Sequence, residues 1–595
     1  MPRYKAPIAE SEFLIERVFS SRLRAGITDA AEVGSDVVHA LLEEIGRIAE
    51  EALAPLNQTG DREGCRIENG VVRTPRGFRQ AYDLLAEGGW IGLTAAPEHG
   101  GQGLPAWLGV ALSEYLNSAN MALAMYVGLS MGAYAAIERH AGEELKQICL
   151  PKLASGRWTG TMNLTEPQCG TDLGLIRTGA VPAGDGTYRI SGTKIFISAG
   201  EHDLAENIVH LVLARIEGAP DGTRGISLFV VPKFLPGADG GIGARNGVQC
   251  LSVETKMGIH GNATCVMQYD DATGWLIGEE NRGLAAMFTM MNEARIGVGV
   301  QGLAASEVAY QNAAGYARER LQGRALTGPA FPDQPADPLI VHPDVRRILM
   351  DIRAFNEAAR ALVTWTVLSA SAARAGDRTA AQAAQDRLGL VTPVVKGVLT
   401  DRGFANTVLA QQLFGGHGYI CETGMEQFVR DARIAMIYEG ANAVQALDLV
   451  GRKLPRDGGR ALVAFLAEVD RALADVDGDE NVREIAQALR RARGDLEAAT
   501  NWLVANALAK PDNAGAGADD YMHLFGLVAL GLMWTMMASA ASQGLAERDG
   551  DADFFHAKLV LARHFAQRTL PESATRLARV SAGADTVMAL PAERF

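Results

Sequence analysis

The sequence predicts an α+β protein that is mostly helical, with one β domain between helical domains and a further helical domain at the C-terminus. Short runs of β-branched residues, broken by Gly, Asp and Pro, occupy only the middle of the chain, whereas apolar residues at helical spacing dominate on either side. The chain has 595 residues, too many for a single core, so three or four domains are expected. Their predicted bounds are residues 1–160, 161–280, 281–454 and 455–595.

The N-terminal domain is expected to be helical. The segment DVVHALLEEIGRIAEEALAPLN, residues 36–57, places apolar residues at helical spacing. The stretch from Trp90 to Pro105 is rich in Gly, Pro and other turn residues, and predicts a loop within this domain.

The middle domain is expected to form antiparallel strands of a small barrel or sandwich. Four runs rich in β-branched residues carry this expectation, at residues 178–200, 207–218, 225–234 and 265–280. Gly, Asp and Pro, residues that are typical of turns, break up these runs.

Helices are predicted again from residue 283 to residue 323 and from 343 to 453, on either side of a proline-rich break, Thr327–Pro338. The segment Pro455–Arg460 predicts a linker into the C-terminal helical domain. The segment AKPDNAGAGADD, residues 509–520, predicts a loop inside that domain, and no internal repeat with a solenoid period is present.

One segment has the length and composition of a membrane span. Residues 521–546 contain no Asp, Glu, Lys or Arg. The flanking residues Asp519, Asp520 and Glu547 are acidic, whereas membrane spans are flanked by Lys and Arg. The Gly, Ala and Ser content favours close packing between helices, so we expect a buried helix and no membrane partner.

Charge and composition disfavour several function classes. The chain has 56 basic and 70 acidic residues, a net charge of −14, and no stripe of Lys or Arg, which disfavours a nucleic-acid partner. The six cysteines are scattered without a CxxC pair, and the eleven histidines include no HExxH motif, so we expect reduced thiols and no metal. The N-terminus lacks an apolar secretory segment, which favours a cytoplasmic location.

The most informative stretch is residues 411–452, QQLFGGHGYICETGMEQFVRDARIAMIYEGANAVQALDLVGR. It places a single carboxylate, Glu439, between Tyr438 and Gly440 in an apolar segment. A carboxylate among apolar neighbours is poorly hydrated and becomes a stronger base. The adjacent glycine allows backbone to approach a ligand closely. We therefore predict a proton-abstracting base beside a flat cofactor or a thioester.

Five motifs accompany this stretch: LTEPQCGTDLG at 164–174, GTKIFISAG at 192–200, NEARIGVGVQG at 292–302, YARER at 316–320 and QLFGGHGY at 412–419. With these motifs in this order, and with IYEG after them, the chain resembles the acyl-CoA dehydrogenase family. The resemblance covers roughly residues 40–453. The N-terminal arm and the C-terminal domain resemble the larger subgroup of that family, which includes 3-methylmercaptopropionyl-CoA dehydrogenase and some bacterial fatty-acyl-CoA dehydrogenases.

The resemblance implies an FAD cofactor between the β domain and the second helical domain, with the acyl-CoA thioester between the flavin and the base. It assigns the base to Glu439, which would take the α-proton as the β-hydrogen leaves as hydride to flavin N5. It implies that the backbone N–H of Glu439 and a flavin hydroxyl polarise the thioester carbonyl. Some relatives carry the base just before the CoA-binding arginine, but Ala294 occupies that position here.

The resemblance also assigns contacts in the β domain and on the following helix. The residues matched to flavin contacts are Met162, Thr165, Gly170, Thr171, Phe196 and Ser198, with Thr171 also near CoA. Arg295 matches an arginine that holds CoA, with Asn292 one helical turn earlier, and Tyr438 and Gly440 flank the substrate. Taken alone, LTEPQCGTDLG reads as a turn, Phe196 as strand core and Arg295 as a surface arginine.

Other matched residues imply an oligomer. Arg320, Gln412, Gly415 and Gly416 match positions that reach the FAD of a neighbouring subunit, so we expect a homodimer. Two departures from the family pattern stand out. Ala441 replaces a threonine that contacts flavin, and Leu321-Gln322 replaces a Phe-Gly pair after Arg320. The GVGVQG segment at 297–302 lacks a preceding strand, so we interpret it as close helix packing rather than a dinucleotide fingerprint.

The predicted function is therefore an FAD-dependent acyl-CoA dehydrogenase that forms a trans-2-enoyl-CoA and passes electrons to an electron-transfer flavoprotein. An acyl-CoA oxidase on the same fold is the first alternative. A nucleic-acid-binding flavoprotein of the same superfamily is a weaker one, because residues 455–595 carry mixed charge. A purely structural helical scaffold is a third. His417, between glycines, is expected to be a turn residue, and the sequence leaves the acyl group open.

Overall fold

The computed structural model describes residues 2–20, 33–237, 241–372 and 378–595. The chain divides into two compact units. Unit 1 comprises Met1–Glu44 and Val298–Phe595, and unit 2 comprises Ile45–Gly297. Helix α3 (Ser35–Ile48) and helix α8 (Gly283–Glu319) each begin in one unit and end in the other.

Unit 2 begins with helices, as the sequence predicts. They are η2 (Ala49–Leu53), α4 (Ala54–Glu63), α5 (Phe78–Glu87), α6 (Ala106–His140) and α7 (Glu143–Ala154). The predicted loop Trp90–Pro105 is irregular apart from the short η3 (Pro97–His99). A hairpin of β1 (Arg66–Glu68) and β2 (Val71–Arg73) lies among these helices and was not predicted, because three-residue strands leave almost no periodic signal.

Helix α6 is interrupted at Asn120, where φ is −159° and ψ is 91°. The Asn120 Oδ1 atom accepts a hydrogen bond from the Leu123 N–H at 3.1 Å, as the first residue of a new helix does. The interruption is buried, so the side chain supplies the hydrogen bond that the helix loses there.

The β domain of unit 2 contains a seven-stranded sheet and a separate pair, β8–β9. Five strands close a ring through the pairings β11–β5, β5–β4, β4–β6, β6–β7 and β7–β11, which fits the predicted small barrel. Strand β6 pairs in parallel with both β3 and β4, so the expectation of a purely antiparallel domain was wrong. The strands are β3 (Trp158–Asn163), β4 (Gly179–Pro182), β5 (Tyr188–Ser198), β6 (Asn207–Ile216), β7 (Ile226–Pro232), β8 (Phe234–Pro236), β9 (Ile242–Arg245), β10 (Val248–Val253) and β11 (Thr264–Ile277).

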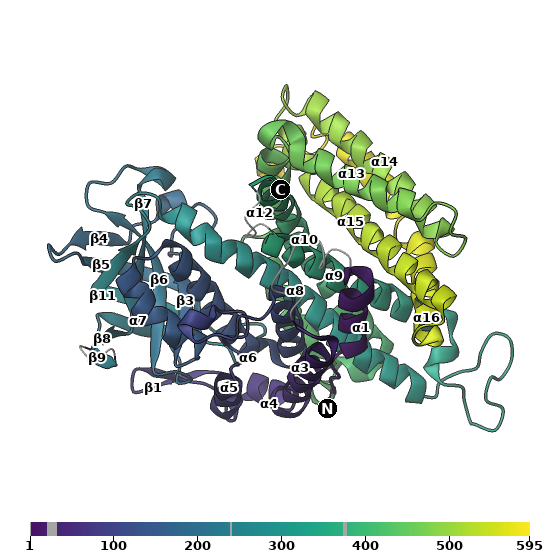
Figure 1. Ribbon diagram of the computed structural model, residues 1–595, viewed down its shortest axis with the longest axis horizontal. Helices are drawn as coiled ribbons and strands as arrows, with labels where there is room; N and C mark the ends of the chain where they lie inside the picture. Colours follow the sequence, from purple (N-terminus) through teal and green to yellow (C-terminus); the bar gives the residue numbers. More distant parts are fainter. Residues whose placement is uncertain (1, 21–32, 238–240, 373–377) are drawn as a thin grey trace. The chain divides into compact units, whose positions relative to one another are not determined.

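Unit 1 is helical (Figure 1). Its central helices are α8, α9 (Pro343–Ala372) and α10 (Arg378–Leu413). Shorter segments follow in the order η7 (Gly415–Tyr419), η8 (Cys421–Thr423), α11 (Met425–Arg433), η9 (Ile434–Met436), α12 (Asn442–Asp448) and η10 (Leu449–Lys453). The C-terminal helices are α13 (Arg460–Asp475), α14 (Arg483–Asn506), α15 (Asp512–Glu547), α16 (Ala552–Arg568) and α17 (Glu572–Ser581).

Two glycines of the GVGVQG segment, Gly299 and Gly302, lie where α8 crosses α10. A Cβ atom on Gly302 would lie 2.4 Å from the Leu399 carbonyl oxygen, and one on Gly403 would lie 2.2 Å from the Gly302 carbonyl oxygen. Backbone therefore meets backbone at this crossing, which confirms the interpretation of the segment as close helix packing.

Helix α15 contains the apolar segment of residues 521–546. It is long and apolar enough to cross a membrane, but 89% of its most apolar window is buried inside the protein, which confirms the predicted buried helix. Helix α6 passes the same test of length and composition and is also mostly buried. The predicted loop at 509–520 was wrong, because α15 already begins at Asp512. Tertiary packing overrides the low helix propensity of its glycines, since Gly517 packs on Val580 and Ala518 is buried.

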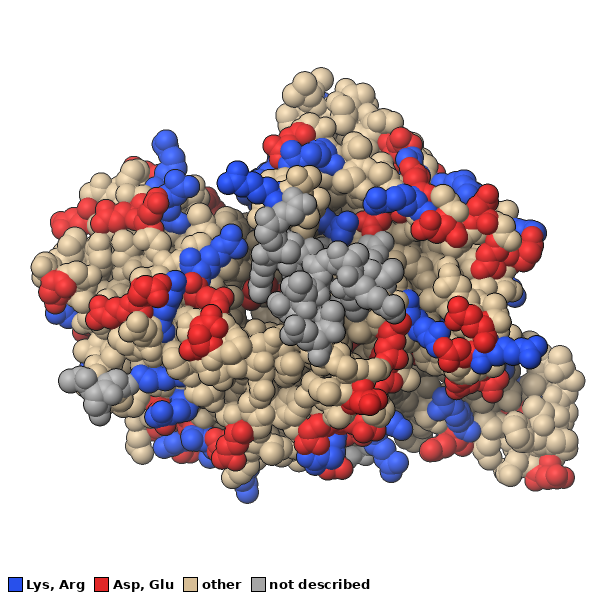
Figure 2. All heavy atoms as spheres, in the orientation of Figure 1, with Lys and Arg blue, Asp and Glu red and all other residues tan. Residues whose placement is uncertain are grey.

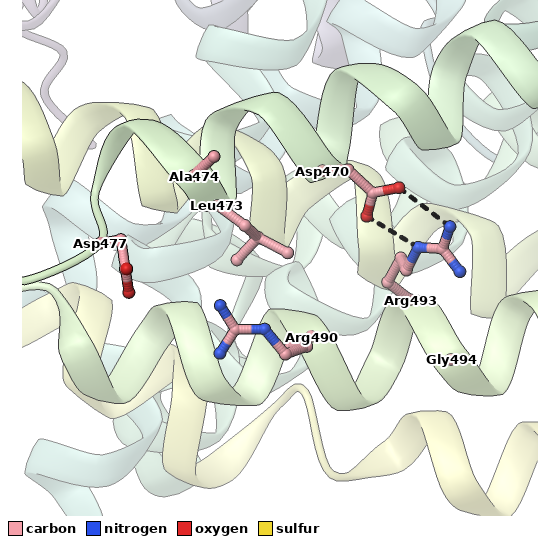
Figure 3. A pocket seen from close by; sticks show the side chains of 7 residues that line it. All are labelled: Asp470, Leu473, Ala474, Asp477, Arg490, Arg493 and Gly494. Carbon is pink, nitrogen blue, oxygen red and sulfur yellow. Dashed lines mark hydrogen bonds and ion pairs between the residues drawn. The ribbon is translucent and has the colours of Figure 1, made fainter.

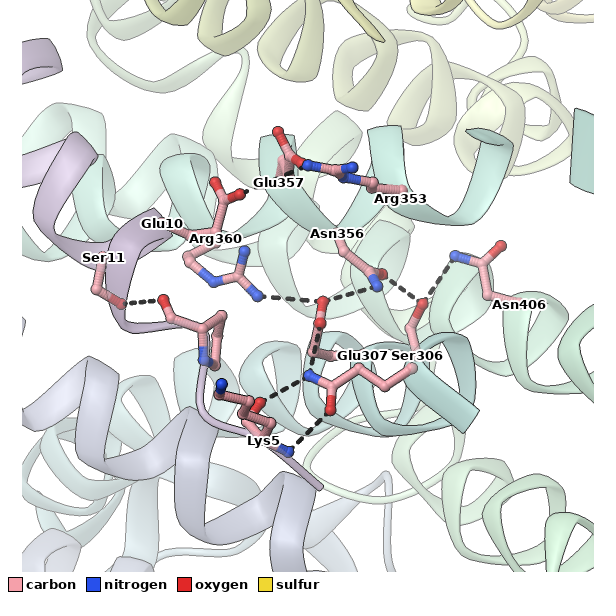
Figure 4. A network of polar contacts seen from close by, with 12 residues as sticks. Lys5, Glu10, Ser11, Ser306, Glu307, Arg353, Asn356, Glu357, Arg360 and Asn406 are labelled. Carbon is pink, nitrogen blue, oxygen red and sulfur yellow. Dashed lines mark hydrogen bonds and ion pairs between the residues drawn. The ribbon is translucent and has the colours of Figure 1, made fainter. Parts of the chain in front are cut away.

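The N-terminal arm, described over residues 2–20, packs against the helices of unit 1 through polar contacts (Figure 4). The Lys558 ammonium, fully buried, contacts the carboxylates of Glu10 and Glu357. The Lys5 N–H donates to Gln311 Oε1 at 2.9 Å. Burial and the neighbouring Glu357 charge raise the pKa of Glu10. The arm therefore connects the C-terminal helix α16 to α9 and to the central helix α8.

Charged side chains of both signs are interspersed over the face in view in Figure 2. All six cysteines are free thiols in this structure. Five of them are buried or half-buried, and only Cys421 is exposed.

Candidate functional site

The predicted site residues fall into two groups, one in each unit. Unit 1 contains Tyr438, Glu439, Gly440, Ala441, Arg320, Gln412, Gly415 and Gly416, and unit 2 contains Met162, Thr165, Gly170, Thr171, Phe196, Ser198, Asn292 and Arg295. Each group is described within its own unit.

In unit 1, Glu439 lies in a short loop between η9 and α12, residues 437–441, which we call the base loop. Glu439 is half-buried, and its backbone is left-handed with φ of 58°. This conformation costs about 1 kcal/mol or more for a residue with a side chain, and such strain clusters at functional sites. Gly440 continues the left-handed turn with φ of 84°. The glycine predicted to allow a close approach is thus required by the backbone itself.

Two glutamines hold the base loop. The Tyr438 hydroxyl donates a hydrogen bond to Oε1 of Gln301 on α8. The Gln445 side chain on α12 donates to the carbonyl oxygens of Glu439 at 3.3 Å and Gly440 at 3.2 Å. Burial and the nearby Glu439 charge raise the pKa of the Tyr438 hydroxyl, which stays neutral and can donate. The strained backbone of Glu439 is therefore supported from two helices.

Ala441 ends the base loop and precedes α12. Its backbone is extended, with φ of −50° and ψ of 152°, and no side chain caps the helix there. The carbonyl of Ala441 accepts hydrogen bonds from the N–H groups of Val444 at 2.8 Å and Gln445 at 3.1 Å. The absence of a hydroxyl at this position, noted in the sequence, thus also leaves α12 without a side-chain cap.

The residues matched to a neighbour's cofactor are exposed. Gln412, Gly415 and Gly416 are exposed, and a Cβ on either glycine would meet nothing within 4 Å. His417 is also exposed in this turn, as predicted. Arg320 directly follows α8 and is exposed, with its carbonyl accepting from the Leu339 N–H at 2.8 Å. Open backbone of this kind is available to a ligand or to a second subunit.

In unit 2, the motif at 164–174 forms a loop after β3 that is anchored by a buried ion pair. Lys194 Nζ lies 2.8 Å from Glu166 Oε1 and donates to the Leu164 carbonyl at 3.0 Å. Both side chains are buried, at 0% and 3% exposure. Burial alone would raise the pKa of Glu166, but the Lys194 ammonium and hydrogen bonds from Thr178 and Arg177 lower it to about 2. A charged carboxylate therefore fixes the loop.

The anchored loop presents small polar groups. Gly170 and Thr171 are exposed and Thr165 is half-buried, around a tight turn between the paired Glu166 and Cys169. Met162 is buried in β3, so its side chain is not open to solvent. Arg215 holds the far end of the motif, donating to the carbonyl oxygens of Gly174 at 2.6 Å and Ile176 at 3.0 Å.

Phe196 is an exposed aromatic residue on a strained strand. Its side chain is 59% exposed and its backbone is left-handed with φ of 58°. The register of β5 against β11 shifts here, since Ile197 pairs with Cys265 whereas Lys194 pairs with Met267. One extra residue in β5 makes a β-bulge, a device that redirects side chains near binding sites. The reading of Phe196 as strand core was therefore wrong, while Ser198 beside it is half-buried.

Arg295 on α8 is buried, with 7% exposure, and its guanidinium lies 5.8 Å from the centre of the Phe288 ring. It is thus not the surface arginine that the sequence alone suggested. Asn292, three residues earlier, is exposed. The two side chains therefore differ in environment although their spacing puts them on one helix face.

Two surface hollows lie apart from most of these residues. One, of about 530 Å³, lies between α13 and α14 (Figure 3). It is lined by the charged residues Asp470, Asp477, Arg490 and Arg493 and by Leu473, Ala474 and Gly494. Arg493 there is already paired with both oxygens of Asp470 at 3.0 Å. The other, of about 460 Å³, adjoins the loop at 164–174 and includes Asp172 and Arg215. Ligand sites are mostly apolar with few polar groups, so the first hollow fits a solvated helix junction better than a substrate site.

Sequence reasoning missed the residues that support the site. Lys194, Glu166 and Gln301 lie inside the recognised motifs, and Gln445 follows the IYEG motif. A signal existed for Lys194, because it occupies an inward position of an alternating strand, two residues after Gly192 and four after the buried Ile190. The two glutamines have no local signature, since their role depends on the spatial meeting of α8, α12 and the base loop.

The chain matches four family profiles in succession. They are described as acyl-CoA dehydrogenase N-terminal domain (residues 35–157), middle domain (161–272) and C-terminal domain (281–454), and as acetyl-CoA dehydrogenase C-terminal like (465–591). The chain is 45% identical to 3-methylmercaptopropionyl-CoA dehydrogenase of Ruegeria pomeroyi over 98% of its own length and 99% of that protein.

Two solved structures share the fold over almost the whole chain. Caenorhabditis elegans ACDH-11 in complex with C11-CoA has a TM-score of 0.80, with 20% identity, over 96% of this chain and 92% of that one. An acyl-CoA dehydrogenase of Bacillus anthracis complexed with FAD has a TM-score of 0.75, with 20% identity, over 96% and 91%. These similarities extend through the additional C-terminal helices.

Proposed function

Because the chain belongs to the acyl-CoA dehydrogenase family, we propose that it is an FAD-dependent enzyme that converts an acyl-CoA thioester into the trans-2-enoyl-CoA, with Glu439 as the base. The observation that carries the proposal is the base loop. A carboxylate is held half-buried on a left-handed backbone by two glutamines, at the position that the family motif assigns to the base.

The residues of unit 2 fit a flavin. A flat apolar ring system needs an exposed aromatic or aliphatic surface, which Phe196 offers, and hydrogen-bonding groups at its polar edge. Thr165, Ser198 and the exposed backbone at Gly170 are such groups, carried on a loop that the Glu166–Lys194 pair anchors. In unit 1, Arg320, Gln412, Gly415 and Gly416 would be available to the FAD of a second subunit.

When bound, FAD would supply the acceptor for the β-hydrogen and its electron pair. The Glu439 carboxylate takes the α-proton, and the electron pair of the broken α C–H bond forms the new double bond. A correctly placed base contributes roughly 10²–10⁴ in rate. The backbone N–H of Glu439 polarises the thioester carbonyl as an oxyanion-hole donor does, which makes the α-proton acidic enough to leave. The support from Gln301 and Gln445 keeps both groups of Glu439 in position.

Arg295 and Asn292 would bind the CoA portion, with Thr171 at the meeting of flavin and CoA. The first substrate to test is 3-methylmercaptopropionyl-CoA, because a relative 45% identical over nearly the whole chain bears that name. Linear acyl-CoAs of graded length are the necessary comparison, since ACDH-11 with the same fold was solved with C11-CoA. An electron-transfer flavoprotein is the proposed electron acceptor.

The test is an anaerobic titration of the flavin-loaded protein with these acyl-CoAs. The proposal predicts bleaching of the flavin absorbance and formation of one enoyl-CoA per flavin with at least one of them. A protein that purifies without flavin, or a flavin that no acyl-CoA bleaches, would contradict it. Rapid reoxidation of the reduced flavin by air would instead favour the oxidase alternative.

A further inference from the structure

We propose that the C-terminal domain positions the catalytic base through His523, which makes His523 a positioning residue for the reaction. The inference rests on the proposed function, because it concerns the placement of Glu439. It gives the additional helices of this chain a role in the chemistry, and it is built from contacts that all lie within unit 1.

The connection begins at Asn442, the first residue of α12 and three residues after Glu439. The Asn442 side chain is buried, and its hydrogen bonds go to one face of α10. Its Oδ1 accepts from the Lys396 ammonium at 2.6 Å. Its Nδ2 donates to Thr400 Oγ1 at 2.9 Å and to Asp401 Oδ1 at 2.7 Å. The start of α12, and with it the end of the base loop, is thus fixed to α10.

Asp401 bridges α12 to the C-terminal domain. Its second carboxylate oxygen, Oδ2, accepts a hydrogen bond from His523 Nε2 of α15 at 3.0 Å. Asp401 therefore uses one oxygen for the base-loop side and the other for the C-terminal side. His523 is buried, with 8% exposure, so this hydrogen bond is shielded from water and holds the carboxylate in one orientation.

Close packing holds helix α15 against helix α10 at this contact. A Cβ on Gly397 of α10 would lie 2.4 Å from the Met522 sulfur, and one on Gly526 of α15 would lie 2.7 Å from Val398. The two helices therefore touch closely on either side of His523. Helix α15 also packs against α12 itself. Such close packing restricts the position of His523, as is required of a residue that positions a catalytic group.

Asp519 offers a third polar group, 3.9 Å from His523 Nε2. Asp401, Asp519 and His523 are the one group among the described residues whose ligand atoms could together hold a metal ion, lying within 4.8 Å of one another. The direct 3.0 Å contact between His523 and Asp401 is a normal hydrogen-bond distance, and Asp519 is mostly exposed. The hydrogen bonds that lead from His523 on α15 through Asp401 to Asn442 on α12, which we call the relay, account for this arrangement.

The chain offers a matched control. Arg402, next to Asp401 on α10, pairs with Glu572 of α17, so it also joins α10 to the C-terminal domain. None of the hydrogen bonds of Asn442 described above involves this pair. The substitution Glu572→Gln therefore weakens the same junction without touching the relay, whereas His523→Ala breaks the relay and His523→Gln keeps a donor near the position of Nε2.

The experiment compares these variants as flavin-loaded full-length proteins. Misplacement of a catalytic group by about 1 Å can reduce the rate by up to roughly 10²-fold. For His523→Ala we expect the rate of flavin reduction by acyl-CoA to fall roughly tenfold, at unchanged flavin content and acyl-CoA affinity. Hydrogen exchange of the peptide covering 437–445 should rise in the same variant. His523→Gln and Glu572→Gln should both stay close to wild type in rate and exchange.

A reduction rate within twofold of wild type in His523→Ala, or an equal loss in Glu572→Gln, would overturn the proposal. If His523→Ala does not fold, His523→Asn replaces it, because the shorter amide cannot reach Asp401. Glu439→Gln separates this inference from the proposed function. If that variant loses flavin reduction while His523→Ala does not, the relay is wrong and the base assignment stands; if Glu439→Gln reduces flavin normally, the proposed function itself fails.

Discussion

The ion pair between Lys194 and Glu166 gives a sharp test of how the loop at 164–174 is held. In Glu166→Gln, one carboxylate oxygen becomes an NH₂ group. Glu166 Oε1 accepts from Lys194 and Thr178, and Oε2 accepts from the Arg177 N–H at 2.7 Å and from Gln168 at 2.7 Å. Either orientation of the amide therefore places a donor against donors, and it leaves the Lys194 charge buried without its counter-charge.

Breaking a buried ion pair on one side costs about 3–5 kcal/mol. With an unfolding entropy of about 2.1 cal/mol/K per residue over the roughly 250 residues of unit 2, this lowers the melting temperature of that unit by roughly 6–9 °C. Differential scanning calorimetry of the flavin-free protein measures it, and flavin affinity should fall in parallel because the loop at 164–174 loosens.

The double substitution Glu166→Met with Lys194→Met is the control. Replacing both charges by apolar side chains removes the unpaired buried charge, so it should recover a large part of the lost stability. A melting temperature of Glu166→Gln within about 2 °C of wild type, or a double variant no more stable than the single one, would refute this account of the loop.

Three further predictions follow from single positions. Because the pKa of Glu166 is lowered to about 2, the stability it provides is fully present above about pH 4.5 and is lost as the pH falls towards 2; urea midpoints should thus show a gap between wild type and Glu166→Gln that narrows over this range. Glu439→Gly should be more stable than Glu439→Ala by about 1 kcal/mol in urea unfolding, because glycine relieves the left-handed strain, while neither reduces flavin; equal stability would contradict the strain. Gly302→Ala should destabilise by about 1–3 kcal/mol because its methyl group meets the Leu399 carbonyl, whereas Gly315→Ala on the same helix, with open space around it, should be neutral or stabilising.

The sequence predicted the fold class because its periodicities are strong and because five motifs occur in a specific order. The helices α8, α9 and α10 and the strands β5, β6 and β7 lie where apolar spacing places them. The GVGVQG segment was interpreted correctly, since close helix packing explains glycines in a continuous helix.

The errors arose where tertiary contacts override local preference. The glycine-rich segment at 509–520 is helical from Asp512 because it packs on α17. The parallel pairing of β6 with β3 and β4 depends on chain crossings that strand patterns do not encode. The exposure of Phe196 follows from a β-bulge, an insertion that shifts the side-chain alternation by one residue.

Those residues of the candidate site that belong to short sequence motifs could be predicted. Glu439 is predicted as the base because a carboxylate in an apolar segment is unusual and because the accompanying motifs resemble those of the family. The supporting residues Gln301, Gln445 and His523 lie on separate helices, and their relation to Glu439 arises only from folding. Supporting residues of this kind have no sequence motif of their own.

The most direct measurement is the rate of flavin reduction in a single turnover, recorded by stopped-flow absorbance under anaerobic conditions, for wild type and Glu439→Gln at equal flavin content. The amide keeps the shape of the side chain but cannot accept the α-proton. The account predicts a fall of roughly 10²–10⁴-fold with acyl-CoA binding retained. A Glu439→Gln variant that reduces its flavin at the wild-type rate would contradict the assignment of the base and the mechanism built on it.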